Sequence, residues 1–247
     1  AGGGWADDWI PPAFKRLPLG IKGVLAVNFL VFLAGAAFPD HPVLGSRASQ
    51  YALSVKPSAA FEALPTSLIF ESLKAISSAF VHASALHLGV NMMSLVHIGQ
   101  YLEQTIGTVP FLVMCAQILF AYSALLFAIA GAARLHPPLS FAALHHKMVG
   151  FSCVLFGLLT VESLAQPQGS EGFKRIIIML VVQYLVFPGV SLLGHSAGIV
   201  AGVLYSRGFL TWSDASRDAV RRVEQSLSGW EGLVRSRPGV SMVRRTR

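Results

Sequence analysis

The chain has 247 residues, of which 53% are hydrophobic and 13% are charged, and its formal net charge is +7. A typical soluble domain carries about 25% charged residues, so this composition argues against an ordinary soluble enzyme. The high apolar content also excludes disorder for most of the chain. Residues 75–102 and 104–133 contain no Asp, Glu, Lys or Arg, and each run exceeds the roughly 20 residues that cross a bilayer core as a helix. The sequence therefore predicts a membrane protein with several helical spans.

The apolar runs predict an all-α fold with six membrane-spanning helices. They cover residues 19–38, 83–102, 109–133, 148–161, 174–188 and 193–210. The fourth run has only fourteen residues, about 21 Å of helix, which is too short to cross a bilayer unaided. We expect it to be buried inside the bundle, with water reaching one end. An apolar stretch from Phe61 to Phe80, in the loop before the second run, is expected on the membrane surface.

Charge placement predicts three parts: an N-terminal cytosolic segment (1–18), a membrane domain (19–210) and a basic cytosolic tail (211–247). The tail holds eight Lys and Arg against four Asp and Glu, and an excess of cations marks the cytosolic side of a membrane protein. The start of the chain lacks the apolar core of a cleavable signal peptide. No basic patch interleaved with aromatic residues is present, so we expect the lipid bilayer and no nucleic acid as a partner.

Polar side chains at the second apolar run form the first candidate group. They are His82, His87 and Asn91. His87 and Asn91 are four residues apart and share one face of a helix, while His82 lies at the mouth. Polar groups within a membrane are costly and usually functional. The structural alternative for each one alone is a hydrogen bond between helices.

Ser152, close to the start of the short fourth run, is the second candidate. A serine in an apolar helix usually bonds back to a carbonyl of the same helix. Gly150, two residues earlier, permits close approach of another group to the backbone. Gly150 and Ser152 together therefore indicate a role beyond helix packing.

His195 in the last run is the third candidate. Gly198 and Gly202 follow it with GxxxG spacing, which favours tight packing against another helix. His195 projects from nearly the same face, so the partner helix is expected to meet the imidazole. A packed core histidine is the alternative explanation.

Together these groups supply a nucleophile, a base and hydrogen-bond donors for an oxyanion, which are the three roles of acyl transfer. A neutral imidazole, with an ordinary pKa of about 6.5, suits the base. If His195 is that base, activity is expected to fall below roughly pH 6–7 as the ring protonates.

Three ordered motifs resemble those of the rhomboid family of intramembrane serine proteases, over about residues 70–210. They are HxxxxHxxxN at His82, His87 and Asn91, GFSCVLFG at 150–157, and GHSAGIVAG at 194–202. The resemblance implies a six-helix rhomboid-like bundle that cleaves transmembrane protein substrates near small or helix-breaking residues, without a cofactor or metal.

The same resemblance implies a role for each matching residue. Ser152 is the nucleophile and His195 the general base, while His87, Asn91 and the Ser152 N–H bind the oxyanion. Gly150 lets the substrate or oxyanion approach the backbone. The remaining supporting positions are His82, Phe156, Gly198 and Gly202.

The chain looks closest to a eukaryotic branch that often adds a ubiquitin-associated domain. The printed sequence shows no such domain after residue 210, so we expect a shortened form or a variant without it. The branch implies partners linked to ubiquitin or to quality control. It also implies the endoplasmic reticulum or the Golgi as the compartment, with the mitochondrion and the plastid left open.

Three positions depart from the family pattern. Cys153 stands where many members have Gly, Phe156 where many have a Tyr that stacks on the histidine, and Leu73-Lys74 where a Trp-Arg pair is common. Phe156 can still stack but cannot hydrogen-bond. The dyad residues are kept, so we expect effects on rate and substrate range.

Two other functions stay open at this level. One is a catalytically inactive rhomboid-like protein that binds or dislocates membrane clients. The other is a transporter or channel in which buried histidines relay protons, although the apolar runs hold no ionised side chain at depth.

Overall fold

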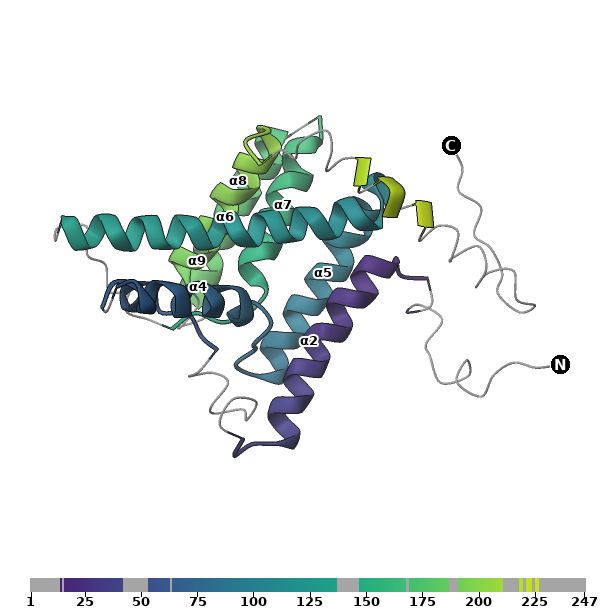
Figure 1. Cartoon of the computed structure of the whole chain (residues 1–247). Coiled ribbons are helices and arrows are strands. Elements are labelled where there is room, and N and C mark those ends of the chain that lie inside the picture. The colour runs from purple at the N-terminus through teal and green to yellow at the C-terminus, as the bar shows by residue number, and fades with distance from the viewer. Residues whose placement is uncertain are drawn as a thin grey trace.

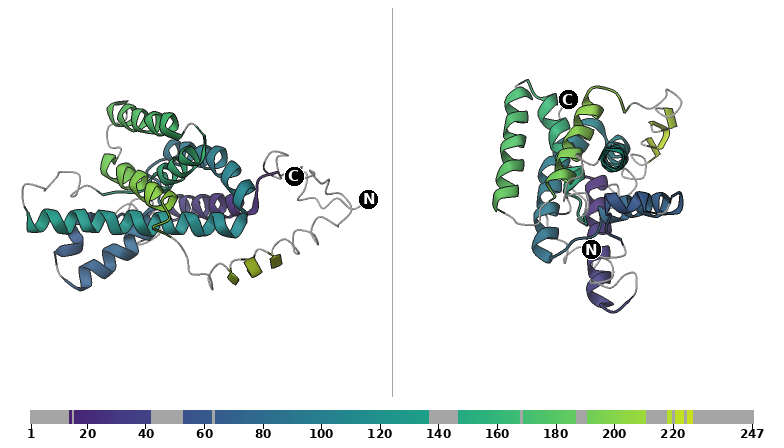
Figure 2. Two further views of the ribbon diagram at one scale, coloured as in Figure 1. Left: turned by 90° about the horizontal axis from the view of Figure 1, so that it is seen from above. Right: turned by 90° about the vertical axis from the view of Figure 1, so that its left-hand side faces the viewer.

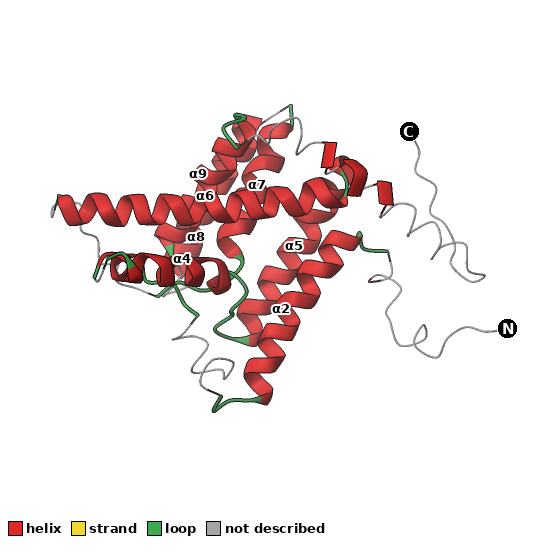
Figure 3. Cartoon of the chain, in the orientation of Figure 1, coloured by secondary structure: helices red, strands yellow, loops and turns green. Residues whose placement is uncertain are grey.

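The computed structural model of the protein is built from helices, and its described part contains no strand (Figure 3). It describes residues 14, 16–41, 53–62, 64–136, 147–167, 169–186, 191–210, 218–219, 221–223 and 225–226. The helices are α2 (Leu19–Ala37), the 3-10 helix η1 (Pro57–Phe61), α4 (Thr66–Ser78), α5 (Ala85–Ile106), α6 (Thr108–Leu135), α7 (Ser152–Ala165), α8 (Gly169–Val186) and α9 (Leu192–Ser206). The prediction of an all-α protein is confirmed. Most of the expected N-terminal segment (1–18) and basic tail (211–247) lies outside the described residues.

The short helix α7 lies at the centre of the bundle (Figures 1 and 2). It packs against α5, α6, α8 and α9, while α2 packs on α5 and α6. Val154 and Leu158 of α7 are fully buried. The expected burial of this fourteen-residue helix is therefore confirmed.

The outer faces of the bundle are apolar, as a lipid-facing surface requires. Leu30 and Leu33 on α2 and Ile178 and Leu185 on α8 are all more than half exposed, which is unusual for a protein surrounded by water. Among the described helices, α2 and α6 are long and apolar enough to cross a membrane, and α7 and α9 are shorter apolar helices. The fold is a membrane helix bundle, and the exact number of six spans stays a prediction.

The start of α7 differs from the expected start at residue 148. Gly150 has φ of 111°, which no helix accepts, and Met148 pairs with Val55 in an isolated antiparallel bridge. The helix therefore begins at Ser152. The helix α8 begins at Gly169, five residues before the expected start of the fifth span at residue 174. Its first residues are polar, so the apolar run does not reveal them.

The stretch expected on the membrane surface contains α4. In two views α4 lies beside the long helix α6 (Figures 1 and 2), and it contacts both α6 and η1. Its position relative to a membrane surface stays a prediction.

Glu103 joins α2 to the turn between α5 and α6, a role that its place in the sequence does not show. Its buried carboxylate accepts the N–H groups of Gly20 at 2.7 Å and Ile21 at 2.8 Å, and the hydroxyl of Thr108 at 2.6 Å. The first N–H groups of a helix have no acceptor within the helix, and a negative charge at this end interacts favourably with the helix dipole. Glu103 therefore caps α2 from a distant part of the chain.

Candidate active site

Ser152 and His195 meet where α7 and α9 begin. The distance between Ser152 Oγ and His195 Nε2 is 2.8 Å. Ser152 is the first residue of α7, directly after the turn at Gly150. His195 lies in the first turn of α9, which is capped by Ser191 because its hydroxyl accepts the Gly194 N–H at 3.0 Å. Two helix starts thus place a hydroxyl and an imidazole within hydrogen-bond distance.

Glycines allow α7 and α9 to approach each other closely. A Cβ atom at Gly198 would overlap the carbonyl oxygen of Cys153, and one at Gly202 would lie 2.8 Å from Thr160 Cβ. From the other side, a Cβ atom at Gly157 would lie 3.1 Å from the Gly198 carbonyl oxygen. The tight packing expected from the GxxxG spacing is present, and His195 faces the partner helix as expected.

Packing holds the His195 ring in place. The Phe156 ring stacks on it with a centroid distance of 4.4 Å and an angle of 27° between the planes, so the expected stacking is confirmed. The ring is buried, and within the described residues its Nδ1 has no hydrogen-bond partner. The ring is therefore held by stacking on its face and, within the described residues, not by the carboxylate that accepts from Nδ1–H in a catalytic triad.

His87 presents one ring nitrogen toward the turn before Ser152. The helix α5 begins after Ser84, whose hydroxyl accepts the His87 N–H at 3.1 Å. The Ala83 N–H donates to His87 Nδ1 at 3.4 Å. In a neutral ring with an accepting Nδ1, Nε2 carries the proton. His87 can therefore donate a hydrogen bond from Nε2.

Gly150 is the position where the α5 side chains approach the segment before Ser152. A Cβ atom there would lie 2.6 Å from His87 Cε1, 2.7 Å from His87 Nε2 and 3.7 Å from Asn91 Nδ2. Asn91 Nδ2 also donates to the His87 carbonyl at 3.0 Å, which uses one of its two hydrogens. The structure thus gathers Gly150, His87 and Asn91 beside Ser152, and only glycine fits both the space and the backbone conformation.

His82 lies against His87, with 5.0 Å between the ring centroids and an edge-on geometry. The sequence placed His82 at the mouth of the site, whereas the structure leaves only 5% of it exposed. Burial, and secondarily the nearby His87, lower the pKa of His82 to about 4. His82 is therefore neutral at neutral pH and contacts a candidate oxyanion donor.

Comparisons with known proteins show the family of this chain. The family model described as the Rhomboid domain matches residues 70–212. This chain belongs to the rhomboid family. Two Arabidopsis thaliana proteins resemble this rhomboid protein: Rhomboid-like protein 15, with 30% identity over 161 residues, and Rhomboid-like protein 14, mitochondrial, with 30% identity over 245 residues. The first match covers 60% of this chain and 40% of the relative, and the second covers 93% and 67%.

A small pocket adjoins Ser152 and His195 in this rhomboid protein. Side chains that the sequence did not single out help to line it, namely Ser78, Tyr122 and Ser191. Ser78 ends α4 and Tyr122 lies in α6, so tertiary packing alone brings them to the site. Among these three residues, Ser191 could have been found from the sequence, because a serine just before an apolar helix is a typical N-cap.

The three departures from the family pattern have defined places in this rhomboid protein. Cys153 is buried, with its Sγ 3.8 Å from the Gly150 carbonyl oxygen. Phe156 keeps the stacking contact described above. Lys74 forms an ion pair with Glu71 at 2.7 Å. Within the described residues no three His, Cys, Asp or Glu side chains cluster as a metal site would need.

Proposed function

We propose that this rhomboid protein is an intramembrane serine endopeptidase that cleaves transmembrane segments of membrane proteins. The observation that carries the proposal is the 2.8 Å distance between Ser152 Oγ and His195 Nε2. A serine hydroxyl is a weak nucleophile until a base accepts its proton. Here the base lies on a helix whose glycine contacts fix it against α7.

In the first step His195 Nε2 accepts the Ser152 proton as Oγ bonds to the scissile carbonyl carbon. The resting neutral ring therefore carries its proton on Nδ1. The carbonyl electrons move to oxygen, and the resulting negative charge is stabilised by His87 Nε2–H, the Asn91 amide and the Ser152 N–H. The Ser152 N–H has no acceptor within α7, because Ser152 is the first residue of that helix. The helix dipole adds positive potential at this end.

In the second step the C–N bond breaks, and the His195 imidazolium gives its proton to the leaving amine. This leaves an ester between Ser152 and the substrate. A water molecule, deprotonated by His195, then attacks the ester carbonyl, and the released Ser152 oxygen regains its proton. The start of α7, beside the cavity at the dyad, is where such water reaches the ester.

Cleavage of a transmembrane reporter by the purified protein in liposomes tests the proposal. Ser152→Ala removes the nucleophile and is expected to reduce cleavage by about 10³-fold or more. Ser94→Ala is a matched control, because Ser94 lies on α5 with its hydroxyl bonded to the Val90 carbonyl, and it should leave the rate within about twofold. Cleavage that survives Ser152→Ala would defeat the assignment.

Covalent labelling separates the protease from the alternative function. A fluorophosphonate is expected to label Ser152 in the folded protein and not in Ser152→Ala. If a folded sample shows neither labelling nor cleavage, the result favours an inactive rhomboid-like protein that binds or dislocates membrane clients.

We also propose a mitochondrial membrane as the compartment, in place of the endoplasmic reticulum or Golgi expected from the branch resemblance. The relative whose match covers 93% of this chain is named mitochondrial. A C-terminal fluorescent fusion imaged with mitochondrial and endoplasmic reticulum markers tests this, and a reticular signal contradicts it.

A further inference from the structure

We propose that Glu71 is a positioning residue for the nucleophile, acting through the backbone that leads to Ser152. The inference rests on the proposed function and adds a part of the machinery that none of the three motifs contains. It concerns the brace, which we define as residues 53–56 together with Glu71, Lys74 and Ser77 of α4.

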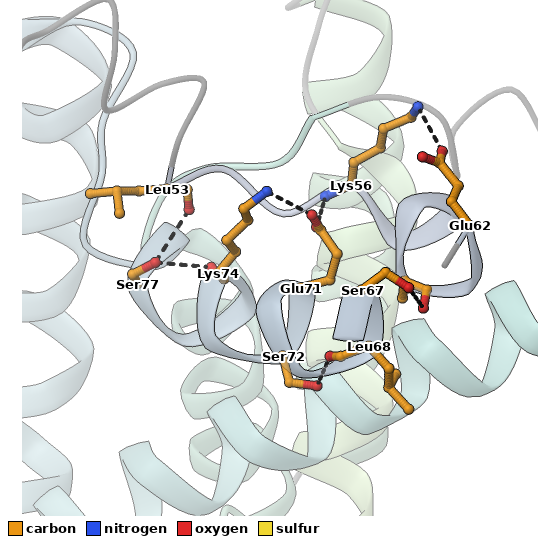
Figure 4. Close-up of polar contacts among 10 residues, drawn as sticks. Leu53, Lys56, Glu62, Ser67, Leu68, Glu71, Ser72, Lys74 and Ser77 are labelled. Carbon is orange, nitrogen blue, oxygen red and sulfur yellow. Dashed lines mark hydrogen bonds and ion pairs between the residues drawn. The ribbon is translucent and has the colours of Figure 1, made fainter. Parts of the chain in front are cut away.

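Glu71 holds one end of residues 53–56. Its side chain is buried in the middle of α4, with 5% of the residue exposed. One carboxylate oxygen accepts the Lys56 N–H at 2.9 Å, and the other accepts the Lys74 ammonium at 2.7 Å (Figure 4). Hydrogen bonds to an ionised group are the stronger ones, and a buried carboxylate becomes unfavourable once its partner is lost. The contact therefore fixes the backbone at Lys56.

Ser77 holds the other end of the same short segment. Its hydroxyl lies 3.4 Å from the Leu53 carbonyl oxygen and 3.3 Å from the Lys74 carbonyl oxygen (Figure 4). Residues 53–56 are thus tied to α4 at both of their ends.

The held segment pairs with the chain just before the nucleophile. The Val55 N–H donates to the Met148 carbonyl at 3.2 Å, and the Met148 N–H donates to the Val55 carbonyl at 2.9 Å. Val55 is fully buried, so this pairing lies inside the protein. Glu71 is therefore connected to Met148, four residues before Ser152, by an unbroken series of hydrogen bonds and one short stretch of chain.

The end of α4 holds the same nucleophile segment at two further points. The Gly150 N–H donates to the Ser78 carbonyl at 2.8 Å. The rings of Phe80 and Phe151 lie 5.9 Å apart. Residues 148, 150 and 151 are thus held by residues 53–56, by the end of α4 and by Phe80 just after it. A shift of α4 would therefore move the start of α7.

The position of Ser152 is sensitive to such a shift. A misplacement of about 1 Å at a reacting group can cost about 100-fold in rate. The contacts described above connect the brace to Met148 and α4. Its effect is therefore expected on the rate of the chemical step rather than on substrate binding.

Glu71→Gln tests the inference because it keeps the shape and removes the charge that holds Lys74. We expect kcat per active site, counted by complete fluorophosphonate labelling, to fall about tenfold with KM within about twofold. The rate of Ser152 labelling should fall in parallel, and Lys74→Arg, which keeps the ion pair, should retain activity. Glu62→Gln is the matched control, because Glu62 pairs with Lys56 at 3.5 Å in an exposed position and does not reach Met148.

A merely structural role predicts a different result. It would lower the thermal midpoint and the number of active molecules but leave kcat per labelled site unchanged, and that outcome overturns the inference. If Glu71→Gln does not fold, Lys74→Met, which spares the Lys56 bond, is measured in the same way. An unchanged kcat there overturns the inference too.

Hydrogen exchange provides a readout that needs no catalysis. Glu71→Gln should speed exchange in residues 147–152, whereas Glu62→Gln should not, and unchanged exchange in Glu71→Gln overturns the inference. If the wild-type protein proves inactive while Glu71→Gln speeds hydrogen exchange in residues 147–152, the proposed function fails, but the link from Glu71 to this segment is supported. If Ser152→Ala abolishes cleavage but Glu71→Gln leaves kcat and exchange unaltered, the brace fails alone.

Discussion

Two regions hold Ser152 in different ways. The contact between α7 and α9 is made of glycines, where the backbone of one helix lies against the backbone of the other. The brace on α4 is made of a buried carboxylate, an ammonium group and backbone hydrogen bonds. The first contact depends on the absence of side-chain volume, and the second on matched polar partners. The first sets the distance between Ser152 and His195, and the second is proposed to set the path of the chain before Ser152.

Gly198→Ala disrupts the glycine contact between α7 and α9, and it is expected to have the largest effect of the variants below. The added methyl group would overlap the Cys153 carbonyl, which is backbone and cannot move aside, so α7 and α9 must separate. We expect kcat/KM for reporter cleavage to fall about 100-fold, because the dyad distance grows.

Gly23→Ala is the control for that variant, because a Cβ atom at Gly23 has no neighbour within 4 Å. It should leave cleavage and thermal stability almost unchanged. If Gly198→Ala stays as active as Gly23→Ala, close packing of the glycines is not what sets the dyad.

A smaller effect is expected at Phe156, which acts through the volume of its ring, whereas the glycines act by lacking a side chain. Phe156→Ala removes the ring that stacks on His195 and frees the imidazole to rotate, so we expect kcat to fall about tenfold. Phe156→Tyr keeps the stacked ring and should retain most of the rate. Equal kinetics of the alanine and tyrosine variants would show that stacking does not orient the base.

The smallest expected effect concerns His82 and pH. As pH falls, cleavage should decline when His195 takes up a proton and can no longer act as the base. The pKa of His82 is lowered to about 4 by burial and, secondarily, by His87, so His82 protonates only near that pH and stays neutral above about pH 5. His82→Gln should therefore leave the midpoint of the acid limb unchanged between pH 5 and 8, measured as kcat/KM in liposomes. A shifted midpoint would assign part of the titration to His82.

The sequence predicted the elements that depend on local pattern. The first apolar run, at 19–38, corresponds to α2 at Leu19–Ala37, because nothing but apolar character is needed to define that helix. It also led to the expectation that Ser152 and His195 meet, because the GxxxG spacing after His195 favours close packing against a partner helix and the family resemblance pairs the two residues. Their catalytic roles stay predictions.

The sequence did not reveal the contacts that depend on distant partners. The start of α7 was misplaced because the pairing of Met148 with Val55 joins residues 93 positions apart in the printed numbering. Glu71 was not singled out, and Lys74 was noted only for its place in the family pattern, since burial of the carboxylate exists only once residues 53–56 lie against α4. Tyr122 reaches the cavity through the packing of α6, which no local pattern encodes.

The carboxylate of Glu103 has a consequence for the order in which the protein assembles during synthesis. Glu103 accepts hydrogen bonds from the N–H groups of Gly20 and Ile21, which are synthesised 83 and 82 residues before Glu103. The start of α2 therefore lacks this cap until Glu103 in α5 has been synthesised. The helix α2 is thus made well before the carboxylate that caps it.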